Sequence, residues 1–390
     1  MTNRVYVMTF LVVLALAALA PAQTFTTLYS FPNGSDGGLP YARLTTDPAG
    51  NLYGTTYYGG VSGGGVVFKV GTAGTASVLY SFCMQKYCAD GSGPVAPVVR
   101  DKAGNIYGTT YFGGGSGGCS GNNYCGTVFK IDTAGKETVL HSFDYSGGCH
   151  PSQGLVMDKS GTLFGTTSGY DCSTYGNIFK LDGAESFIIL HSFAGPPSDG
   201  AYPNYGNLAM DKSGNLYGLT AEGGADNWGA LYELSKSGTF TLLHSFIPGT
   251  SDGCDPEGSV VRDNAGNLYG TTNGCGSTGN GTIWKVSEKG KETILHNFAG
   301  GSSDGCYPYG GVARDTKGNL YGVTYACGAN GYGALYKLST SGRLTLLHSF
   351  DYSDGILPIG EVLRNGKGTL YGTTYMGGTY GYGTVWSYVP

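Results

Sequence analysis

The sequence predicts an all-β fold, a seven-bladed β-propeller of four-stranded antiparallel blades. A heptapeptide close to GNLYGTT occurs seven times, with its first glycine at positions 50, 104, 161, 214, 266, 318 and 368. A spacing of about 50 residues is typical of propellers and related arrays. Each repeat contains four short runs of strand-forming residues, and the two chain ends hold complementary parts of one repeat. We number the blades 1 to 7 in the order of the heptapeptides.

The four strands of a repeat, called a to d, are predicted at 259–262, 267–272, 282–286 and 293–298 in blade 5. Short Asp-x-x-Gly turns join a to b and c to d, as at Asp101 and Asp132, and such residues favour tight turns. The b–c and d–a loops are longer and rich in glycine. In an antiparallel blade the tight turns lie on one face and the long loops on the other, so we expect function on the long-loop face.

The chain ends predict how the ring closes. Residues 24–31, TFTTLYSF, match a d strand with no a, b or c strand before it, and residues 383–389, GTVWSYV, match a c strand with no d strand after it. The N-terminal strand is therefore predicted to complete blade 7, which removes an unpaired sheet edge. Arg43 and Glu361 occupy the same repeat offset in blades 1 and 7, so we expect an ion pair at the closure.

The N-terminus predicts export. Residues 1–22 have a basic residue, Arg4, then an apolar run and the small residues Ala20-Pro21-Ala22, which is the pattern of a secretory signal peptide. An uncleaved N-terminal anchor is the alternative. Residues 23–390 are then one domain of seven repeats of about 52 residues. We expect a monomer that is secreted, extracellular or periplasmic, without a membrane span after cleavage. The net charge of −5 offers no basic surface for nucleic acid.

Ten cysteines in an exported chain predict disulfides. In blades 3, 5 and 6, one cysteine of the d–a loop and one of the b–c loop lie on the same predicted face. This predicts the pairs Cys149–Cys172, Cys254–Cys275 and Cys306–Cys327. For blade 2 we predict Cys83–Cys88 and Cys119–Cys125, with a crossed arrangement as the alternative. No Cys-x-x-Cys occurs, and no metal site is predicted.

The pattern GNLYGTTxxGG followed by GTVFK, LHSF and SDGxxP resembles the GloVer-type ("choice-of-anchor") tandem repeat of secreted bacterial proteins. The resemblance covers residues 24–390. It implies an exported, propeller-like protein without an assigned activity.

Two repeated polar positions have structural interpretations. Five histidines occupy one position of strand d, and tyrosine takes it in two repeats; the residues are Tyr29, Tyr80, His141, His191, His244, His296 and His348. Because they belong to different blades, we expect a hydrogen-bonding role. An aspartate begins Asp-Gly-x-x-Pro in six repeats, at Asp36, Asp90, Asp199, Asp252, Asp304 and Asp354. We predict a turn before strand a. A ring of these carboxylates holding a structural cation such as calcium is the alternative, and no cofactor is otherwise predicted.

Functional chemistry is expected where the repeat is interrupted, chiefly in the loops of blades 3 to 5. A glycan could be bound by exposed aromatic side chains on the loop face. These candidates are Trp228, Tyr57, Tyr58, Tyr111, Tyr325 and Tyr375. Carboxylates beside an aromatic side chain also suit a polysaccharide lyase or glycoside hydrolase. The candidates for that alternative are Glu222, Asp226, Asp255, Glu257 and His150.

The chain lacks G-x-S-x-G, H-E-x-x-H and a P-loop. We therefore predict a binding or scaffold module for an extracellular glycan or surface partner, rather than an enzyme.

Overall fold

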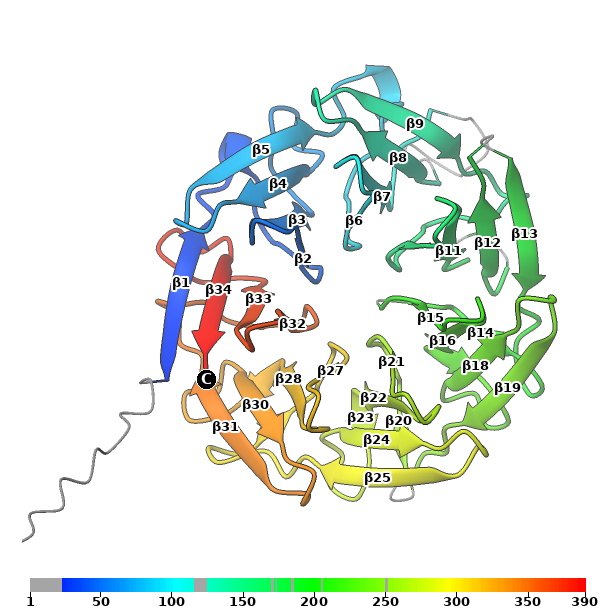
Figure 1. Ribbon diagram of the computed structural model, residues 1–390, viewed down its shortest axis with the longest axis vertical. Helices are drawn as coiled ribbons and strands as arrows, with labels where there is room; N and C mark the ends of the chain where they lie inside the picture. Colours follow the sequence, from blue (N-terminus) through cyan, green and yellow to red (C-terminus); the bar gives the residue numbers. More distant parts are fainter. Residues whose placement is uncertain are drawn as a thin grey trace, which may run out of the picture.

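The computed structural model is a ring of seven blades (Figure 1) and describes residues 23–115, 125–169, 172, 174–183, 186–204, 206–249 and 252–390. The predicted signal peptide lies outside these residues. Each blade is one four-stranded antiparallel sheet, with strand a at the centre of the ring and strand d at its edge (Figure 1). The predicted propeller is confirmed.

The strands of blades 1 to 4 follow the predicted order. Blade 1 consists of β2 (Thr45–Thr46), β3 (Leu52–Thr56), β4 (Val66–Val70) and β5 (Ala76–Ser81). Blade 2 consists of β6 (Val99–Arg100), β7 (Ile106–Thr110), β8 (Thr127–Ile131) and β9 (Glu137–Ser142). Blade 3 consists of β10 (Val156–Met157), β11 (Leu163–Thr167), β12 (Asn177–Leu181) and β13 (Phe187–Ser192). Blade 4 consists of β15 (Ala209–Met210), β16 (Leu216–Thr220), β18 (Ala230–Leu234) and β19 (Phe240–Ser245).

Blades 5 to 7 complete the ring. Blade 5 consists of β21 (Val261–Arg262), β22 (Leu268–Thr272), β24 (Thr282–Val286) and β25 (Glu292–Asn297). Blade 6 consists of β27 (Ala313–Arg314), β28 (Leu320–Thr324), β30 (Ala334–Leu338) and β31 (Leu344–Ser349). Blade 7 consists of β32 (Leu363–Arg364), β33 (Leu370–Thr374), β34 (Thr384–Val389) and β1 (Thr24–Ser30). Two short 3-10 helices, η1 (Gly34–Asp36) and η2 (Lys86–Cys88), lie in d–a loops.

The last five residues of the heptapeptide form strand b, and in blade 1 the residues from Leu52 to Thr55 show how they pack. In blade 1, Leu52 packs toward blade 7 and Tyr53 toward blade 2, because neighbouring side chains of a strand point to opposite faces. Gly54 lies beneath the ring of Phe68, so a Cβ there would come within 2.6 Å of the ring. Thr55 donates a hydrogen bond of 3.0 Å to the Ala96 carbonyl of blade 2. The heptapeptide therefore joins neighbouring blades.

The ring closes as predicted. Strand β1 pairs antiparallel with β34, and Thr24 is the register partner of Val389 (Figure 1). The Phe25 ring stacks on His348 of blade 6, with centroids 3.7 Å apart. Arg43 and Glu361 form the expected ion pair, with an Nη1–Oε1 distance of 3.3 Å.

The long loops are tied together on one face. Two-stranded ladders join the d–a loop to the b–c loop in three blades. The ladders are β14 (Gly200–Ala201) with β17 (Glu222–Gly223), β20 (Gly253–Cys254) with β23 (Gly274–Cys275), and β26 (Gly305–Cys306) with β29 (Ala326–Cys327). This pairing places both kinds of loop on the same face, as predicted from the turn lengths.

Disulfides reinforce these loops. The structure contains the bonds Cys83–Cys88, Cys149–Cys172, Cys254–Cys275 and Cys306–Cys327. Cys125 is also disulfide-bonded, and its predicted partner Cys119 lies outside the described residues. Within the described part of the chain, no helix is long and apolar enough to cross a membrane.

Candidate functional site

The repeated histidines and aspartates are hydrogen-bonded partners. The Nε2–Oδ2 distances are 3.0 Å for His191–Asp199, 3.2 Å for His244–Asp252, 3.1 Å for His296–Asp304 and 2.7 Å for His348–Asp354. Tyr29 and Tyr80 donate equivalent bonds of 2.9 Å to Asp36 and Asp90. This pairing was not predicted from the sequence, because the two positions belong to different elements of the repeat. The aspartates bond to the outer strands, so they do not form the ring of carboxylates considered at the channel.

Five of the six aspartates also accept hydrogen bonds from backbone amides of the loop before strand a. Asp304 accepts bonds of 2.9 Å from the Ala299 amide and 2.8 Å from the Gly305 amide. Burial acts to raise the pKa of Asp304, but the bonds from His296 and these amides hold it below its usual range. This contact supports the turn interpretation.

Blade 3 lacks the aspartate, and Gly147 stands in its place. The His141 Nε2 atom is buried without a hydrogen-bond partner, and its ring stacks on Phe187 at 3.9 Å. Burial lowers the pKa of His141, although Asp144 acts in the opposite direction.

The His244–Asp252 pair between blades 4 and 5 has a third residue, Glu292, beside it. Glu292 Oε1 lies 3.6 Å from His244 Nε2, and single ligand atoms of His244, Asp252 and Glu292 lie within 4.8 Å of one another. Burial, together with Asp252, raises the pKa of Glu292 to about 8. A divalent metal would have to displace the existing His244–Asp252 bond, which recurs in other blades. We therefore interpret this group as part of the blade contact.

Tyrosines follow strand b on the loop face of blades 6, 7, 1 and 2. We call Tyr325, Tyr375, Tyr57, Tyr58 and Tyr111 the tyrosine crescent. Burial raises the pKa of Tyr57 to about 12, and Tyr58, Tyr375 and Tyr111 add to the shift from nearby. Tyr375 is in turn shifted by burial, Tyr58 and Tyr325. These electrostatic influences indicate that tyrosine side chains from four adjacent blades lie near one another on the loop face.

The members of the crescent are partly exposed, and Tyr58 exposes 50% of its surface. The Tyr57 and Tyr58 rings contact edge to face, with centroids 4.4 Å apart. Tyr41 and Tyr309 of the inner loops extend the group, at 5.7 Å from Tyr375 and 5.1 Å from Tyr325. Their packing fixes the rings, which lowers the entropic cost of contacting a ligand.

Blade 5 places two of the candidate carboxylates beside the crescent. Glu257 Oε2 is buried without a hydrogen-bond partner, and burial with a contribution from Asp255 raises the pKa of Glu257 to about 7. Burial also raises the pKa of Asp255. Both carboxylates act electrostatically on Tyr309, which links them to the crescent. The Asp255 amide donates to the Trp228 carbonyl at 3.3 Å, so the blade 4 loop adjoins them as expected.

The remaining candidates have other surroundings. Glu222 lies in the β14–β17 ladder, where it pairs with Ala201, and Asp226 is exposed. His150 is buried between blades 2 and 3, where it stacks on Tyr111 at 4.5 Å and its Nδ1 lies 2.9 Å from the Tyr111 carbonyl.

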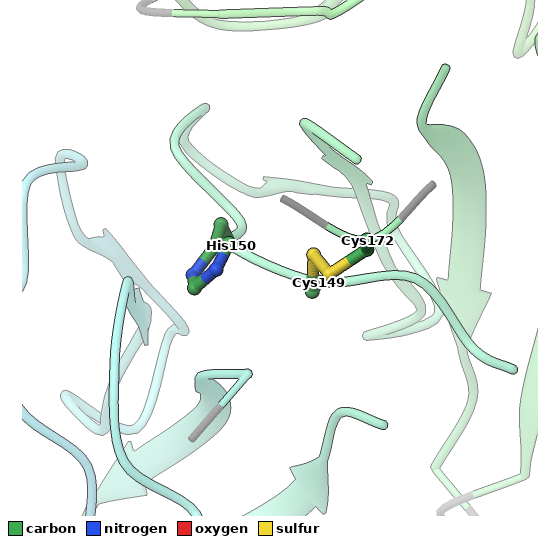
Figure 2. A group of neighbouring side chains, drawn as sticks. All are labelled: Cys149, His150 and Cys172. Atoms are coloured by element: carbon green, nitrogen blue, oxygen red, sulfur yellow. A yellow bond between two sulfur atoms is a disulfide. The ribbon is translucent and has the colours of Figure 1, made fainter. Parts of the chain in front are cut away.

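Figure 2 shows the His150 ring turned away from the Cys149–Cys172 disulfide. Although these three residues have ligand atoms close together, both sulfurs are already bonded to each other. His150 therefore supports the crescent through Tyr111, and the Cys149–His150–Cys172 group does not constitute a metal site.

The central channel is narrow at the inner strands. Its cavity encloses about 50 Å³ and is lined by residues of all seven blades, including Tyr41, Arg43, Ser152, Ser259, Tyr309 and Glu361. A space of this size holds a few water molecules, not a sugar ring. The channel is therefore too small for an extended ligand.

The fold and its loop ladders define a seven-bladed repeat propeller with a disulfide-reinforced loop face. The chain belongs to the Gloeobacter/Verrucomicrobia repeat family, whose model matches residues 15–179, 117–314 and 173–386. No curated protein sequence matches the chain.

Solved structures share the fold at low sequence identity. The extracellular domain of a hybrid two-component system from B. thetaiotaomicron is 16% identical with a TM-score of 0.58, covering 94% of this chain and 41% of the other. The extracellular domain of a one-component system from the same organism is 10% identical with a TM-score of 0.57, covering 93% and 40%. A candidate 6-phosphogluconolactonase from Bacteroides uniformis is 15% identical with a TM-score of 0.51, covering 78% and 83%. The chain thus spans about two fifths of the first two proteins.

Proposed function

We propose that the protein is a secreted or periplasmic binding module that recognises an extracellular glycan through the tyrosine crescent. The observation that carries this proposal is the gathering of partly exposed tyrosines from four adjacent blades on the loop face, namely Tyr325, Tyr375, Tyr57 and Tyr111. Fixed, half-exposed aromatic rings stack on the apolar faces of sugars, and the adjacent carboxylates can accept hydrogen bonds from hydroxyl groups. The disulfides and the extracellular domains with the same fold support the location.

A glycan array followed by calorimetry with the best-bound oligosaccharide tests the proposal. Tyr58→Ala and Tyr375→Ala should each weaken binding about tenfold, since one stacked ring contributes on the order of 1 kcal/mol or more. Tyr87→Ala is the matched control, because Tyr87 is exposed but lies outside the crescent. Unchanged affinity in both crescent variants would exclude this site, and binding of protein partners alone would identify a scaffold instead.

A second candidate function is glycoside cleavage, which the pair Asp255 and Glu257 favours. Glu257 is protonated over a wider pH range than an ordinary glutamate, because its pKa is raised to about 7, and an acid of this kind can protonate a leaving group. Asp255 would then stabilise charge or activate water from the adjacent position.

Reducing-sugar release from the bound glycan distinguishes the two functions. Turnover that falls at least a hundredfold in Glu257→Gln, while affinity is retained, would establish the enzyme. If the native protein binds a glycan but releases no reducing sugar from it, the binding module is the function that stands.

A further inference from the structure

A second surface lies on the opposite face of the ring, where the tight turns are. A groove of about 780 Å³ separates blades 3 and 4 and is bordered by the a–b turns of both blades and the c–d turn of blade 4. Its apolar lining includes Phe164, Leu190, Met210, Leu216 and Leu234. This volume is in the range of small-molecule sites.

The groove lies at a blade interface where the repeat is interrupted at two facing positions. At three of the other six interfaces an arginine of strand a covers a tyrosine of the preceding blade, with distances from the guanidinium carbon to the ring centroid of 4.4, 5.5 and 5.4 Å. The pairs are Arg100–Tyr53, Arg262–Tyr217 and Arg314–Tyr269. Between blades 3 and 4 the corresponding residues are Met210 and Phe164, which pack in one cluster. The interface between blades 3 and 4 therefore has neither the arginine cation nor the tyrosine hydroxyl group.

A third substitution extends the apolar surface outward. Phe164 is the register partner of Lys180, and Lys180 is the partner of Ile188 on the outer strand β13. Paired residues of antiparallel strands project on the same side of the sheet. Ile188 exposes 40% of its surface, whereas the same position holds serine or threonine in the other six blades. Three positions on this side of blade 3 and the facing strand of blade 4 are thus apolar, namely those of Phe164, Met210 and Ile188.

Positive charge surrounds this surface. Four lysines line the groove, namely Lys159, Lys180, Lys212 and Lys236, against two aspartates, Asp158 and Asp211. Asp211 already accepts bonds from the Ser213 and Asn215 amides, and Asp158 from those of Ser160 and Thr162. Among the described residues, none of the four lysines makes an ion pair within 4.0 Å.

We propose that this groove binds a free amphiphilic carboxylate, a molecule with one anionic head and a long apolar body. The apolar body lies against Phe164, Met210 and Leu190, and the carboxylate is held by the lysines of the turns. The positive charge of the lysines favours a ligand with an anionic head. The confined apolar lining between the two blades favours a single apolar chain over a ligand with a flat surface.

Dodecanoate, used below its micelle concentration, is the probe for calorimetric titration of the full-length protein. It should bind with a dissociation constant below about 1 mM, and raising salt from 50 to 500 mM should weaken binding. Dodecyltrimethylammonium has the same chain with the opposite charge, and it should bind at least tenfold more weakly. Equal binding of the two probes, or no dodecanoate binding at 1 mM, would overturn the proposal.

Two sets of variants locate the site. Phe164→Tyr with Met210→Arg restores the residues found at other interfaces, so it should fill the groove and weaken dodecanoate binding more than tenfold although it adds positive charge. Lys159→Glu with Lys212→Glu changes only exposed side chains and should also weaken binding about tenfold. Lys102→Glu, at the same turn position in blade 2, should alter affinity less than twofold.

Normal binding by both double variants would refute this location. Binding that requires phosphatidylglycerol vesicles, or that is seen only with acidic peptides, would replace the free amphiphile with a different partner and would equally refute the proposal.

Discussion

At the scale of single residues, the histidine–aspartate pair connects two positions of the repeat that lie six to eight residues apart in the chain. Blade 7 is entered by His348-Ser-Phe-Asp-Tyr-Ser-Asp354-Gly, and blade 3 has His141-Ser-Phe-Asp-Tyr-Ser-Gly147-Gly at the matching place. The two segments differ at one residue, and only the first has the bond, of 2.7 Å. The native protein thus contains one segment with the histidine–aspartate hydrogen bond and a nearly identical segment without it.

Gly147→Asp should restore the missing contact and stabilise the protein by about 1 kcal/mol. A Cβ at Gly147 would lie 3.8 Å from His141 Nε2 in ordinary van der Waals contact, and this glycine does not have positive φ. The gain requires a charged aspartate and a protonated histidine, so it should be largest between about pH 4 and pH 6.5, and the pKa of His141 should rise. Urea unfolding and NMR titration measure both effects; Gly147→Asn, which cannot pair with a charge, is the control. Equal stability of the two variants would contradict the prediction.

Glu257 gives a second pH dependence. Its folded pKa of about 7 exceeds the ordinary value of 4.5, so the neutral acid favours the folded state. Its contribution is fully present below pH 4.5 and is lost as the pH rises through about 7. Glu257→Gln should therefore stabilise the protein by about 1–2 kcal/mol at pH 8 and have little effect at pH 4. Denaturant unfolding at both pH values measures this difference, with Glu222→Gln of the β14–β17 ladder as the control. A variant effect that is independent of pH would disprove the assignment.

At the scale of elements, the inner strands are held close together by glycine. A Cβ on Gly258 of blade 5 would lie 2.4 Å from the Gly311 amide nitrogen of blade 6. Backbone cannot move away as a flexible side chain can, so the two loops fix the width of the channel between them.

Gly258→Ala should cost about 2–3 kcal/mol of stability, because the methyl group forces blades 5 and 6 apart. Gly366→Ala is the matched control, since a Cβ there meets no atom within 4 Å and its φ is not positive. The control should change stability by less than about 0.5 kcal/mol. Thermal and urea unfolding provide the comparison, and a tolerated Gly258→Ala would show that the channel can widen.

The repeat also determines what the sequence could predict at this scale. Strand order, ring closure, the loop-to-loop disulfides and the Arg43–Glu361 pair follow from position within a period, which can be compared seven times within one chain. The coupling of Asp255 with Glu257, and of tyrosines from four blades, depends on side-chain direction and burial across interfaces. The groove was missed because function was expected only on the long-loop face, although Phe164 and Met210 are visible departures from the repeat.

At the scale of the whole molecule, the ring depends on one noncovalent strand pairing. Strand β1 covers β34, whose Val385, Trp386 and Tyr388 are buried. Deleting residues 24–31 would expose these side chains and the edge of β34. We expect a loss of about 5 kcal/mol and a melting temperature lower by about 10 °C. An unchanged melting temperature in a calorimetric scan would show that β1 does not close the ring.

A circular permutant separates the strand's contacts from its place in the chain. Since Thr24 and Val389 are register partners, a tight turn patterned on Ser287–Lys291, which joins β24 to β25, can connect them. The new ends are then placed in η1. The permutant should fold with a far-UV spectrum like that of the native chain and regain most of the stability lost on deletion, because β1 retains its hydrogen bonds to β34 and the stack of Phe25 on His348. Its stability should remain somewhat below native, because the η1 link between blades 7 and 1 is cut. A permutant no more stable than the deletion would show that covalent linkage through η1, rather than the β1–β34 pairing, keeps the ring closed.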